Sequence, residues 1–597
     1  MKNHQLLPLA LPFALCFGCG SNDNTATVHP PETAQHRTDS SDAAFMRLAD
    51  GYFDTYYFPT NPTIATYNGI HTYDSKLEDF SKAGIDANVK ALKEWEKKVA
   101  AVDSSALSEQ VQGDRMLVLN NIRTTLLTLQ SIRPWEKNPD FYSSGITTSA
   151  FTLMERKFAA PEARLKDLIA RERAMPAFLG HAKDNLQDPP KIFTQIALDQ
   201  LPGLVEFFKN DVPKAFTTVT DDALRKEFTA SNDSVIAALQ DYMAWLKKDV
   251  LPKGNGDFMI GADTYRKKLE YDEMVTTPLD QLIALDTANM HHNQQQFAEV
   301  AKQLDPKKTP REVLAELATD GPKPDSLLPA FRATFDHLIS FIKDKKIITL
   351  PSDVRPILEE TPPFMRAITF ASMDTPGPYE QNATEAYFNV TLPEKDWTPK
   401  HTAEFMAQFS YAVISSVAVH EAYPGHYVQF LWMHKLDDRV RKILGCNTNA
   451  EGWAHYCEQM MLDEGLATAM YPNDERQQLE LRLGQLQDAL LRNARFVVGI
   501  KLHTGEMTMD QAIQYFVDEG YQSRAVGEVE TKRATSDPTY LYYTLGKLEI
   551  LKLRKDMEAK QGKDFDLMTF HDNFMKQGFA PIKIVRKAML GDDSPTL

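Results

Sequence analysis

Helical periodicity runs through most of this 597-residue chain and constrains its fold more than any other feature. From about residue 44 to 346, apolar side chains recur every three or four positions, with charged residues between them. The pattern returns near Pro399 and continues, with interruptions, to about residue 576. It predicts a mainly α-helical protein, and the clearest helices are expected over 86–102, 161–186, 234–250 and 326–344.

A different pattern separates the two helical stretches. Residues 347–397 are rich in proline, threonine and β-branched side chains, which favour short strands and turns. The best strand candidate is 385–392, with the sequence EAYFNVTL. We therefore expect an N-terminal helical region over 44–346 and a second region over 347–597 that begins with a small β-element.

The N-terminus has the order of a bacterial lipoprotein signal. An apolar run over 6–17 is too short to span a membrane and suits the core of a secretory signal. A glycine and Cys19 follow, and then a polar stretch rich in serine and threonine. We expect a signal peptide over 1–19, a flexible tether over 20–43, and a lipid anchor on Cys19 that holds the protein in the bacterial envelope, facing the periplasm. A plain cleaved signal peptide is the alternative.

The acidic balance of the chain argues against one class of partner. The formal net charge is −16 at pH 7, whereas a protein that binds nucleic acid normally presents a basic face. No nucleic-acid partner is therefore expected, and the sequence leaves the oligomeric state open. Export permits a disulfide between Cys446 and Cys457, but two buried free thiols fit the sequence equally well.

The stretch VHEAYPGHYVQF holds two histidines near a glutamate. His420 and His426 are six residues apart, whereas zinc-binding helices usually place such histidines four apart, on one face. Pro424 supplies no N–H to the helix, and Gly425 can adopt backbone angles closed to other residues. We therefore expect the helix to break over 422–425 and to resume near His426, which brings the two imidazoles together. The alternative is a helix–loop–helix corner with two surface histidines.

A third metal ligand is expected in NTNAEGWAHYCEQMMLDEGL, residues 447–466. Glu451, His455 and Glu458 lie at helical spacing there, on one face of an expected helix. A catalytic zinc ion takes three protein ligands, and zinc enzymes use the set His/His/Glu. Glu451 is the first candidate and His455 the next. Alternatively, Glu451 is a charge favoured at a helix N-terminus, and Glu458 is a solvated residue or a partner of a ligating histidine.

These motifs together resemble a bacterial family catalogued as Domain of Unknown Function 885, whose members are gluzincin-like and often lipoproteins. The likeness includes VHEAYPGHYVQ, NAEGWAHYCEQ and the upstream YFNV, and it extends to residues 491–516 and 542–554. It therefore covers most of the mature chain.

The resemblance implies a zincin-like, mostly helical fold with a metallopeptidase site. In that site His420, His426 and Glu451 would bind Zn²⁺, and Glu421 would act as the base. This chain has Gly499 where the family usually has an aspartate, a change that bears on substrate preference more than on the metal.

Bound zinc would lower the pKa of its water toward neutral, so Glu421 could take a proton from the water and pass it to the leaving amine. His503 and Tyr543, both in segments that resemble the family, are the candidates for stabilising the oxyanion. The alternatives are a satisfied helical histidine and a core tyrosine. The strand at 385–392 could pair with the backbone of a peptide substrate.

The expected function is thus a zinc-dependent peptidase that acts on short or unfolded peptides. Two other classes fit the sequence: a non-catalytic, lipid-anchored protein that captures peptides, and a zinc hydrolase of a non-peptide amide. Zinc content together with peptide turnover separates the first class from an enzyme, and a profile of substrates separates the second.

Overall fold

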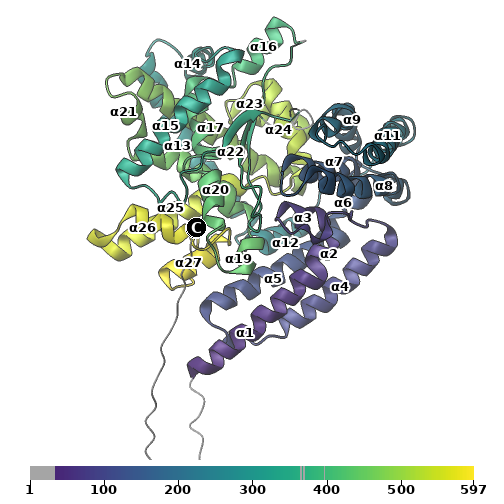
Figure 1. Cartoon of the computed structure of the whole chain (residues 1–597). Helices are drawn as coiled ribbons and strands as arrows, with labels where there is room; N and C mark the ends of the chain where they lie inside the picture. Colours follow the sequence, from purple (N-terminus) through teal and green to yellow (C-terminus); the bar gives the residue numbers. More distant parts are fainter. Residues whose placement is uncertain (1–33, 363–365, 367–369, 396) are drawn as a thin grey trace, which may run out of the picture.

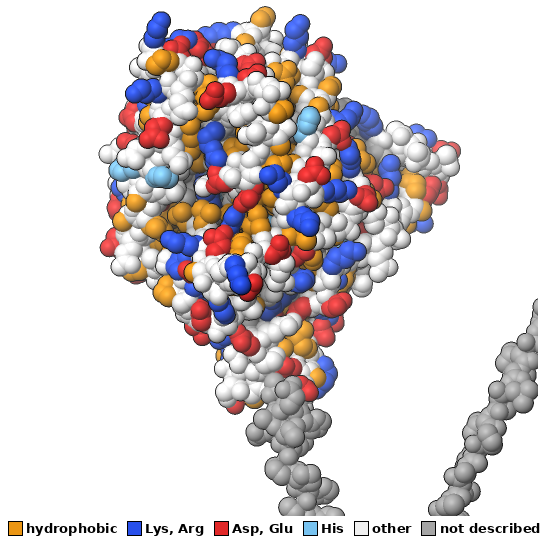
Figure 2. All heavy atoms as spheres, turned by 90° about the vertical axis from the view of Figure 1, so that its left-hand side faces the viewer, with side chains coloured by type: hydrophobic (Ala, Val, Ile, Leu, Met, Phe, Trp, Pro, Cys, Tyr) orange, Lys and Arg blue, Asp and Glu red, His pale blue; other side chains and the backbone are white. Residues whose placement is uncertain are grey.

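The protein is mainly α-helical in the computed structural model, which describes residues 34–362, 366, 370–395 and 397–597 (Figure 1). The predicted signal peptide and Cys19 lie outside the described residues. The first helix, α1, begins at Ala34, within the range predicted as a flexible tether. None of the described helices is long and apolar enough to cross a membrane. On the face seen in Figure 2, acidic and basic side chains are interspersed.

The N-terminal region is built from helices, as predicted. Its α-helices are α1 (Ala34–Tyr52), α2 (Phe58–Thr60), α3 (Pro62–Tyr67), α4 (Lys82–Ala100), α5 (Glu109–Leu127), α6 (Pro134–Lys137), α7 (Asp140–Glu155), α8 (Pro161–Asn185), α9 (Lys191–Glu206), α10 (Val212–Ala215), α11 (Asp222–Trp245), α12 (Ala262–Glu273), α13 (Leu279–Leu304), α14 (Pro310–Leu317) and α15 (Leu327–Lys345). Capping residues explain why α4 and α11 begin earlier than expected. The side chains of Ser81 and Asp221 accept hydrogen bonds from the first turns of these two helices.

Three short strands follow and form a small mixed sheet. They are β1 (Ile357–Glu360), β2 (Ala371–Asp374) and β3 (Tyr387–Val390), in the spatial order β1-β3-β2. β3 pairs in parallel with β1 and antiparallel with β2. The strand predicted over 385–392 is therefore the central one. The expectation that it pairs with a peptide is wrong, because both of its edges are already occupied.

The rest of the chain returns to helices. They are α16 (Pro399–Met406), α17 (Tyr411–Glu421), α18 (His426–Met433), α19 (Arg439–Ile443), α20 (Asn447–Asp463), α21 (Leu466–Met470), α22 (Glu475–Thr504), α23 (Met509–Asp518), α24 (Arg524–Ser536), α25 (Tyr542–Gln561), α26 (Leu567–Met575) and α27 (Ile582–Leu590). The 30-residue helix α22 packs against α13, α17 and α24, and α20 packs along α25.

One hydrophobic core joins the two predicted regions. Phe45 and Tyr52 of α1 belong to the same buried cluster as Trp453 of α20 and Val585 of α27. A second cluster lies mostly within residues 142–250. The predicted boundary after residue 346 therefore marks a change of secondary structure rather than a gap in packing.

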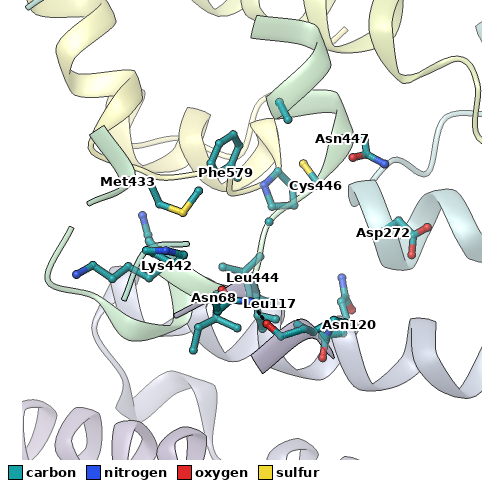
Figure 3. A pocket seen from close by; sticks show the side chains of 18 of the residues that line it. Asn68, Leu117, Asn120, Asp272, Met433, Lys442, Leu444, Cys446, Asn447 and Phe579 are labelled. Carbon is teal, nitrogen blue, oxygen red and sulfur yellow. Dashed lines mark hydrogen bonds between the residues drawn. The ribbon is translucent and has the colours of Figure 1, made fainter. Parts of the chain in front are cut away.

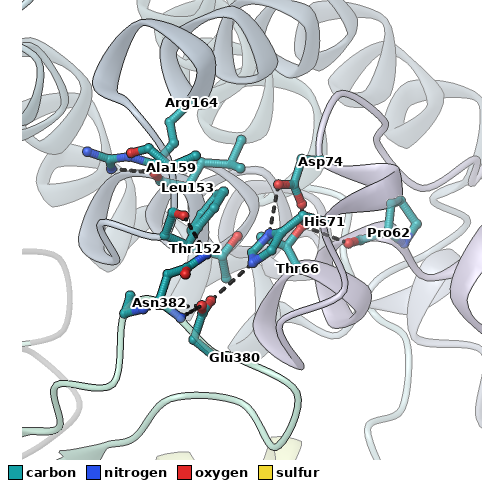
Figure 4. A network of polar contacts seen from close by, with 12 residues as sticks. Pro62, Thr66, His71, Asp74, Thr152, Leu153, Ala159, Arg164, Glu380 and Asn382 are labelled. Carbon is teal, nitrogen blue, oxygen red and sulfur yellow. Dashed lines mark hydrogen bonds and ion pairs between the residues drawn. The ribbon is translucent and has the colours of Figure 1, made fainter. Parts of the chain in front are cut away.

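An ionic network also ties the N-terminal helices to the loop between β2 and β3 (Figure 4). His71 lies between two carboxylates, with Nδ1 2.9 Å from Asp74 Oδ2 and Nε2 3.0 Å from Glu380 Oε2. Glu380 also accepts hydrogen bonds from the backbone N–H groups of Asn382 and Ala383. Burial by itself lowers the pKa of His71, but the hydrogen bonds and charges of Asp74 and Glu380 raise it overall. The protonated imidazole is therefore the form that holds the two parts together.

Candidate metal centre

The helix that carries the first histidine breaks where the sequence predicts it. α17 ends at Glu421, four residues follow, and α18 begins at His426. Within the break, the N–H of Gly425 donates to the carbonyl oxygen of Val419 at 3.0 Å. This close approach requires glycine, because a Cβ at position 425 would lie only 1.7 Å from the carbonyl oxygen of His420.

The two histidines converge, and Glu451 of α20 joins them. The ring centroids of His420 and His426 are 4.8 Å apart. Glu451 Oε2 lies 3.2 Å from His420 Nε2 and 3.4 Å from His426 Nε2. One ligand atom from each of the three residues lies within 4.8 Å of the other two. His420 is only 5% exposed, so the alternative of a corner with two surface histidines does not hold.

The surroundings of Glu451 suit a cation at this point. Its Oε2 is buried and makes no hydrogen bond of suitable geometry, although two imidazole nitrogens lie near it. Burial by itself raises the pKa of Glu451, but His420 and His426 outweigh burial and hold that pKa well below its usual range. An ionised carboxylate and two imidazole nitrogens make the donor set that zinc takes in His/His/Glu sites. These three residues therefore fit Zn²⁺.

Behind His420, Glu458 fixes the orientation of the imidazole. His420 Nδ1 donates to Glu458 Oε1 at 2.7 Å, which leaves Nε2 facing Glu451. Arg492 of α22 approaches the same carboxylate oxygen at 3.1 Å, and the Glu458 side chain is fully buried. Burial by itself raises the pKa of Glu458, but the charge of Arg492 and the nearby histidines hold it well below its usual range. Such a carboxylate sets the tautomer of a metal-binding histidine and makes it a better ligand.

Two questions that the sequence left open are answered near this centre. His455, the second candidate for the third ligand, places its Nδ1 3.1 Å from Glu458 Oε2 and is not among the three converging residues. Burial, helped by the charge of Lys547, lowers the pKa of His455 to about 3. Cys446 and Cys457 are both free and buried, so they form no disulfide.

Glu421 reaches from the ligand-bearing helix to the edge of the sheet. Met373 of β2 donates its backbone N–H to Glu421 Oε2 at 3.1 Å. Met373 is paired opposite Phe388 at a position where its N–H points away from β3. Burial raises the pKa of Glu421, although His420 and His426 oppose the rise. The carboxylate therefore lies between the histidine helix and an edge strand.

The region from residue 62 to residue 589 matches the sequence model of DUF885, a family described as bacterial proteins of unknown function. The chain belongs to the DUF885 family. The description of the family assigns no activity, so the zincin-like character of the fold and site stays a prediction.

Two solved structures, both described as putative lipoproteins, have the same fold as this DUF885 chain. The one from Shewanella oneidensis, of unknown function, is 26% identical, with a TM-score of 0.73 over 94% of this chain and 100% of that one. The one from Colwellia psychrerythraea is 18% identical, with a TM-score of 0.75 over 93% of this chain and 99% of that one. No curated protein matches the chain.

Of the two oxyanion candidates, the DUF885 fold brings Tyr543 to the site. Tyr543 lies in the first turn of α25, is 5% exposed, and has its ring centroid 6.4 Å from that of His420. Burial and the charge of Glu451 raise the pKa of Tyr543, so the hydroxyl keeps its proton. Arg533 of α24 donates a hydrogen bond to this hydroxyl at 3.2 Å.

His503, the other candidate, is not part of the site. It follows Arg492 by three turns of α22, which places it about 16 Å farther along the helix. Its Nε2 donates to the carbonyl oxygen of Ala534 at 2.8 Å, and burial lowers its pKa to about 4. His503 is thus a buried helical histidine, as the alternative interpretation has it, but it is only partly satisfied, because its Nδ1 has no hydrogen-bond partner among the described residues.

Two glycines that the sequence analysis did not use determine how closely α20 and α25 approach. A Cβ on Gly452 would lie 2.5 Å from the Cα of Gly546, and a Cβ on Gly546 would lie 1.8 Å from the carbonyl oxygen of Thr448. Both glycines stand inside the motifs, next to Glu451 and three residues after Tyr543. Their position inside the two motifs, on two helices that face each other, was the signal by which the sequence analysis could have found them.

A cavity of about 470 Å³ is lined partly by residues that are next to those of the centre in the chain, although none of His420, His426 and Glu451 is in its wall (Figure 3). Ala450, which precedes Glu451, and Thr375, which follows β2, are both in its wall. Its lining combines aromatic and aliphatic side chains with amides and four charged residues, and it includes Tyr57, Asn120, Asp272, Glu273, Phe430, Arg441 and Lys442. A cavity of this size and character suits side chains of a bound molecule.

Proposed function

We propose that this DUF885 protein is a zinc-dependent peptidase that hydrolyses short or unfolded peptides. The observation that carries the proposal is the convergence of His420, His426 and Glu451, with Glu421 beside them and Glu458 behind His420. Zinc bound there would supply a Lewis acid and a water of lowered pKa. The remaining chemistry belongs to side chains of this protein.

In this proposal Glu421 acts as the general base. It takes a proton from the attacking water and delivers that proton to the leaving nitrogen of the peptide bond. Burial raises the pKa of Glu421 and so makes it a better proton acceptor than an exposed glutamate. The N–H of Met373 holds one of its oxygens in place.

In this proposal Tyr543 donates a hydrogen bond to the carbonyl oxygen under attack. Because Arg533 donates to the tyrosine oxygen, the hydroxyl hydrogen itself remains available for the substrate. The raised pKa of Tyr543 keeps that hydrogen in place at neutral pH.

The edge strand β2 and the cavity give a peptide two kinds of contact. β2 is an edge strand, and the N–H of Met373 on that edge bonds to Glu421, so an extended peptide that pairs with the other backbone groups of this edge would lie near the ligands. Side chains of that peptide would enter the cavity that begins at Thr375. An extended backbone is available only in short or unfolded peptides, which is why we propose these as substrates.

Zinc analysis and peptide digestion of three proteins test the proposal. We expect the wild type to bind one zinc ion and Glu451→Ala to lose most of it. Glu421→Gln should keep zinc while turnover falls by about 10²–10⁴, because glutamine cannot take a proton. Wild-type turnover in Glu421→Gln would exclude Glu421 as the base.

The same measurements separate the two other function classes. If the wild type binds zinc and peptides but cleaves none of a broad peptide library, the proposed function changes from a peptidase to a protein that captures peptides. Turnover confined to non-peptide amides would reassign the substrate.

We also propose that a lipid on Cys19 anchors the protein in the bacterial envelope, facing the periplasm. The order of the N-terminal sequence supports this, and so do the descriptions of the two similar structures as lipoproteins. Cys19→Ser should release the protein from the membrane fraction in a cell fractionation experiment. An unchanged membrane fraction would exclude the anchor.

A further inference from the structure

Three arginines lie around Tyr543, the proposed oxyanion donor, and they differ in whether a carboxylate forms an ion pair with them. Arg492 lies 3.1 Å from Glu458, and Arg495 donates two hydrogen bonds, of 2.7 and 2.8 Å, to the two oxygens of Glu530. Among the residues that the structure describes, no carboxylate oxygen forms an ion pair with Arg533. The third guanidinium therefore has no carboxylate bonded to it and can accept one.

The carboxylates nearest to Arg533 in the chain are already engaged. Both oxygens of Glu530 accept hydrogen bonds from Arg495, and one also accepts from the hydroxyl of Tyr540. Asp537 accepts a hydrogen bond of 2.8 Å from a neighbouring tyrosine hydroxyl. Neither carboxylate forms an ion pair with Arg533, although the charge of Glu530 acts on its guanidinium from farther away.

Arg533 is exposed, although it contacts a buried part of the site. It lies in the last turn of α24, and its Nη2 donates to the hydroxyl of Tyr543 at 3.2 Å. Its guanidinium lies over the ring of Tyr540, 5.0 Å from the centroid, which restricts its orientation. A guanidinium has five N–H donors in a planar fork, so most of them stay available. An oriented, exposed cation with open donors suits an anionic group of the substrate.

We propose that Arg533 binds a carboxylate of the peptide substrate and so selects peptides that carry one close to the scissile bond. This inference rests on the proposed peptidase function. A carboxylate matches the fork of arginine with two parallel hydrogen bonds, and every unmodified peptide carries one at its C-terminus. A glutamate or aspartate side chain offers the same chemistry.

The position of Arg533 limits where that carboxylate lies. Arg533 contacts Tyr543, whose hydroxyl we place at the scissile carbonyl. An extended peptide advances about 3.3 Å per residue, so a terminal carboxylate at Arg533 belongs to the first or second residue after the scissile bond. The products are then peptides shortened by one or two residues at the C-terminus.

Peptides synthesised in matched forms test the inference. N-acetylated pentapeptides are prepared with a C-terminal carboxylate, with a C-terminal amide, and as amides that carry a terminal glutamate in place of glutamine. Mass spectrometry gives kcat/KM and the cleavage position. Calorimetry on the Glu421→Gln background gives peptide affinity, a readout that does not depend on turnover.

We expect the wild type to prefer the carboxylate form over the amide by roughly 10- to 100-fold, in kcat/KM and in affinity. Arg533→Ala should lower the kcat/KM and the affinity for the carboxylate form to the values for the amide. Arg533→Lys should restore part of the preference. Arg524→Ala is the matched control, because Arg524 is exposed on the same helix but already pairs with Glu528 at 3.2 Å. It should leave the preference unchanged.

The outcomes separate this inference from the peptidase proposal. A preference restricted to the terminal carboxylate assigns Arg533 to the C-terminus, and a preference for the glutamate amide assigns it to an acidic side chain. Binding that prefers carboxylates through Arg533 without any cleavage keeps the inference and refutes the peptidase. Three results refute the role of Arg533: equal kcat/KM and affinity for acids and amides, a preference that survives Arg533→Ala, or no binding of any form of the peptide.

Discussion

One added methyl group at Gly425 should remove zinc binding without unfolding the protein. In Gly425→Ala the new Cβ would lie 1.7 Å from the carbonyl oxygen of His420 and 2.4 Å from that of Val419, both in the backbone of α17. Cβ atoms do not approach other atoms closer than 3.0 Å, so one segment must move by at least about 1.3 Å. Zinc–ligand distances tolerate only about 0.2 Å. His420 and His426 would therefore no longer meet at one ion.

The affinity for zinc should fall by more than about 100-fold, because loss of an outer partner alone costs about 10- to 100-fold. The free energy of unfolding should fall by about 1–3 kcal/mol, the usual cost of overpacking. Competition with a chromogenic chelator measures the zinc Kd, and circular dichroism and Tm report on the fold.

Gly203→Ala is the matched control for this substitution. Gly203 lies in α9, and a Cβ there would meet nothing within 4 Å, so zinc affinity should not change. Stability should rise by about 0.5–1 kcal/mol, because alanine is the better helix former. A folded Gly425→Ala protein with the zinc affinity of the wild type would refute the claim that this glycine sets the spacing.

Two further substitutions test the carboxylate that orients a metal ligand and the ionic contact between the N-terminal helices and the loop between β2 and β3. Glu458→Gln should weaken zinc binding by about 10- to 100-fold in the chelator assay, because the charge that orients His420 is lost; an unchanged Kd would contradict this. His71→Gln should lower the free energy of unfolding by at least about 1 kcal/mol near pH 6 and by less near pH 9. The pKa of His71 is raised in the folded state, so its contribution is complete below the unfolded value of about 6.5 and is lost as pH rises through the folded value. Denaturant unfolding at both pH values measures this, and an effect that grows with pH would show that the sign is wrong.

Much of the fold and most of the centre could be predicted because their signals are local. Apolar periodicity identifies helices without knowledge of their partners, and the Pro-Gly pair before His426 marks the break within a few residues. Helical spacing and the number of ligands that zinc takes narrowed the third ligand to residues of 447–466, and the resemblance to the family pointed to Glu451. The convergence of these side chains is what the structure adds.

Features that depend on distant contacts could not be read in the same way. The order of strands is set by pairing across the sheet, so the sequence pointed to the central β3 and not to the edge strand β2. A motif identified the helix of His503 but could not show that the centre lies at the Arg492 end, three turns away. The lack of an ion pair on Arg533 became visible only once Glu530 and Asp537 were seen to bond to other residues.

The glycine contact between α20 and α25 divides the centre into two mechanical blocks. One block carries Glu451 and Tyr543 on helices whose backbones touch at Gly452 and Gly546, and these two side chains must move together. The other block carries both histidines and Glu421 on α17 and α18, and the hydrogen bond from His420 to Glu458 of α20 ties it to the first. Any slippage between the blocks changes metal coordination and carbonyl polarisation at the same moment. Activity lost in that way could not be recovered by improving either side chain alone, and only a second change that realigns the helices would restore it.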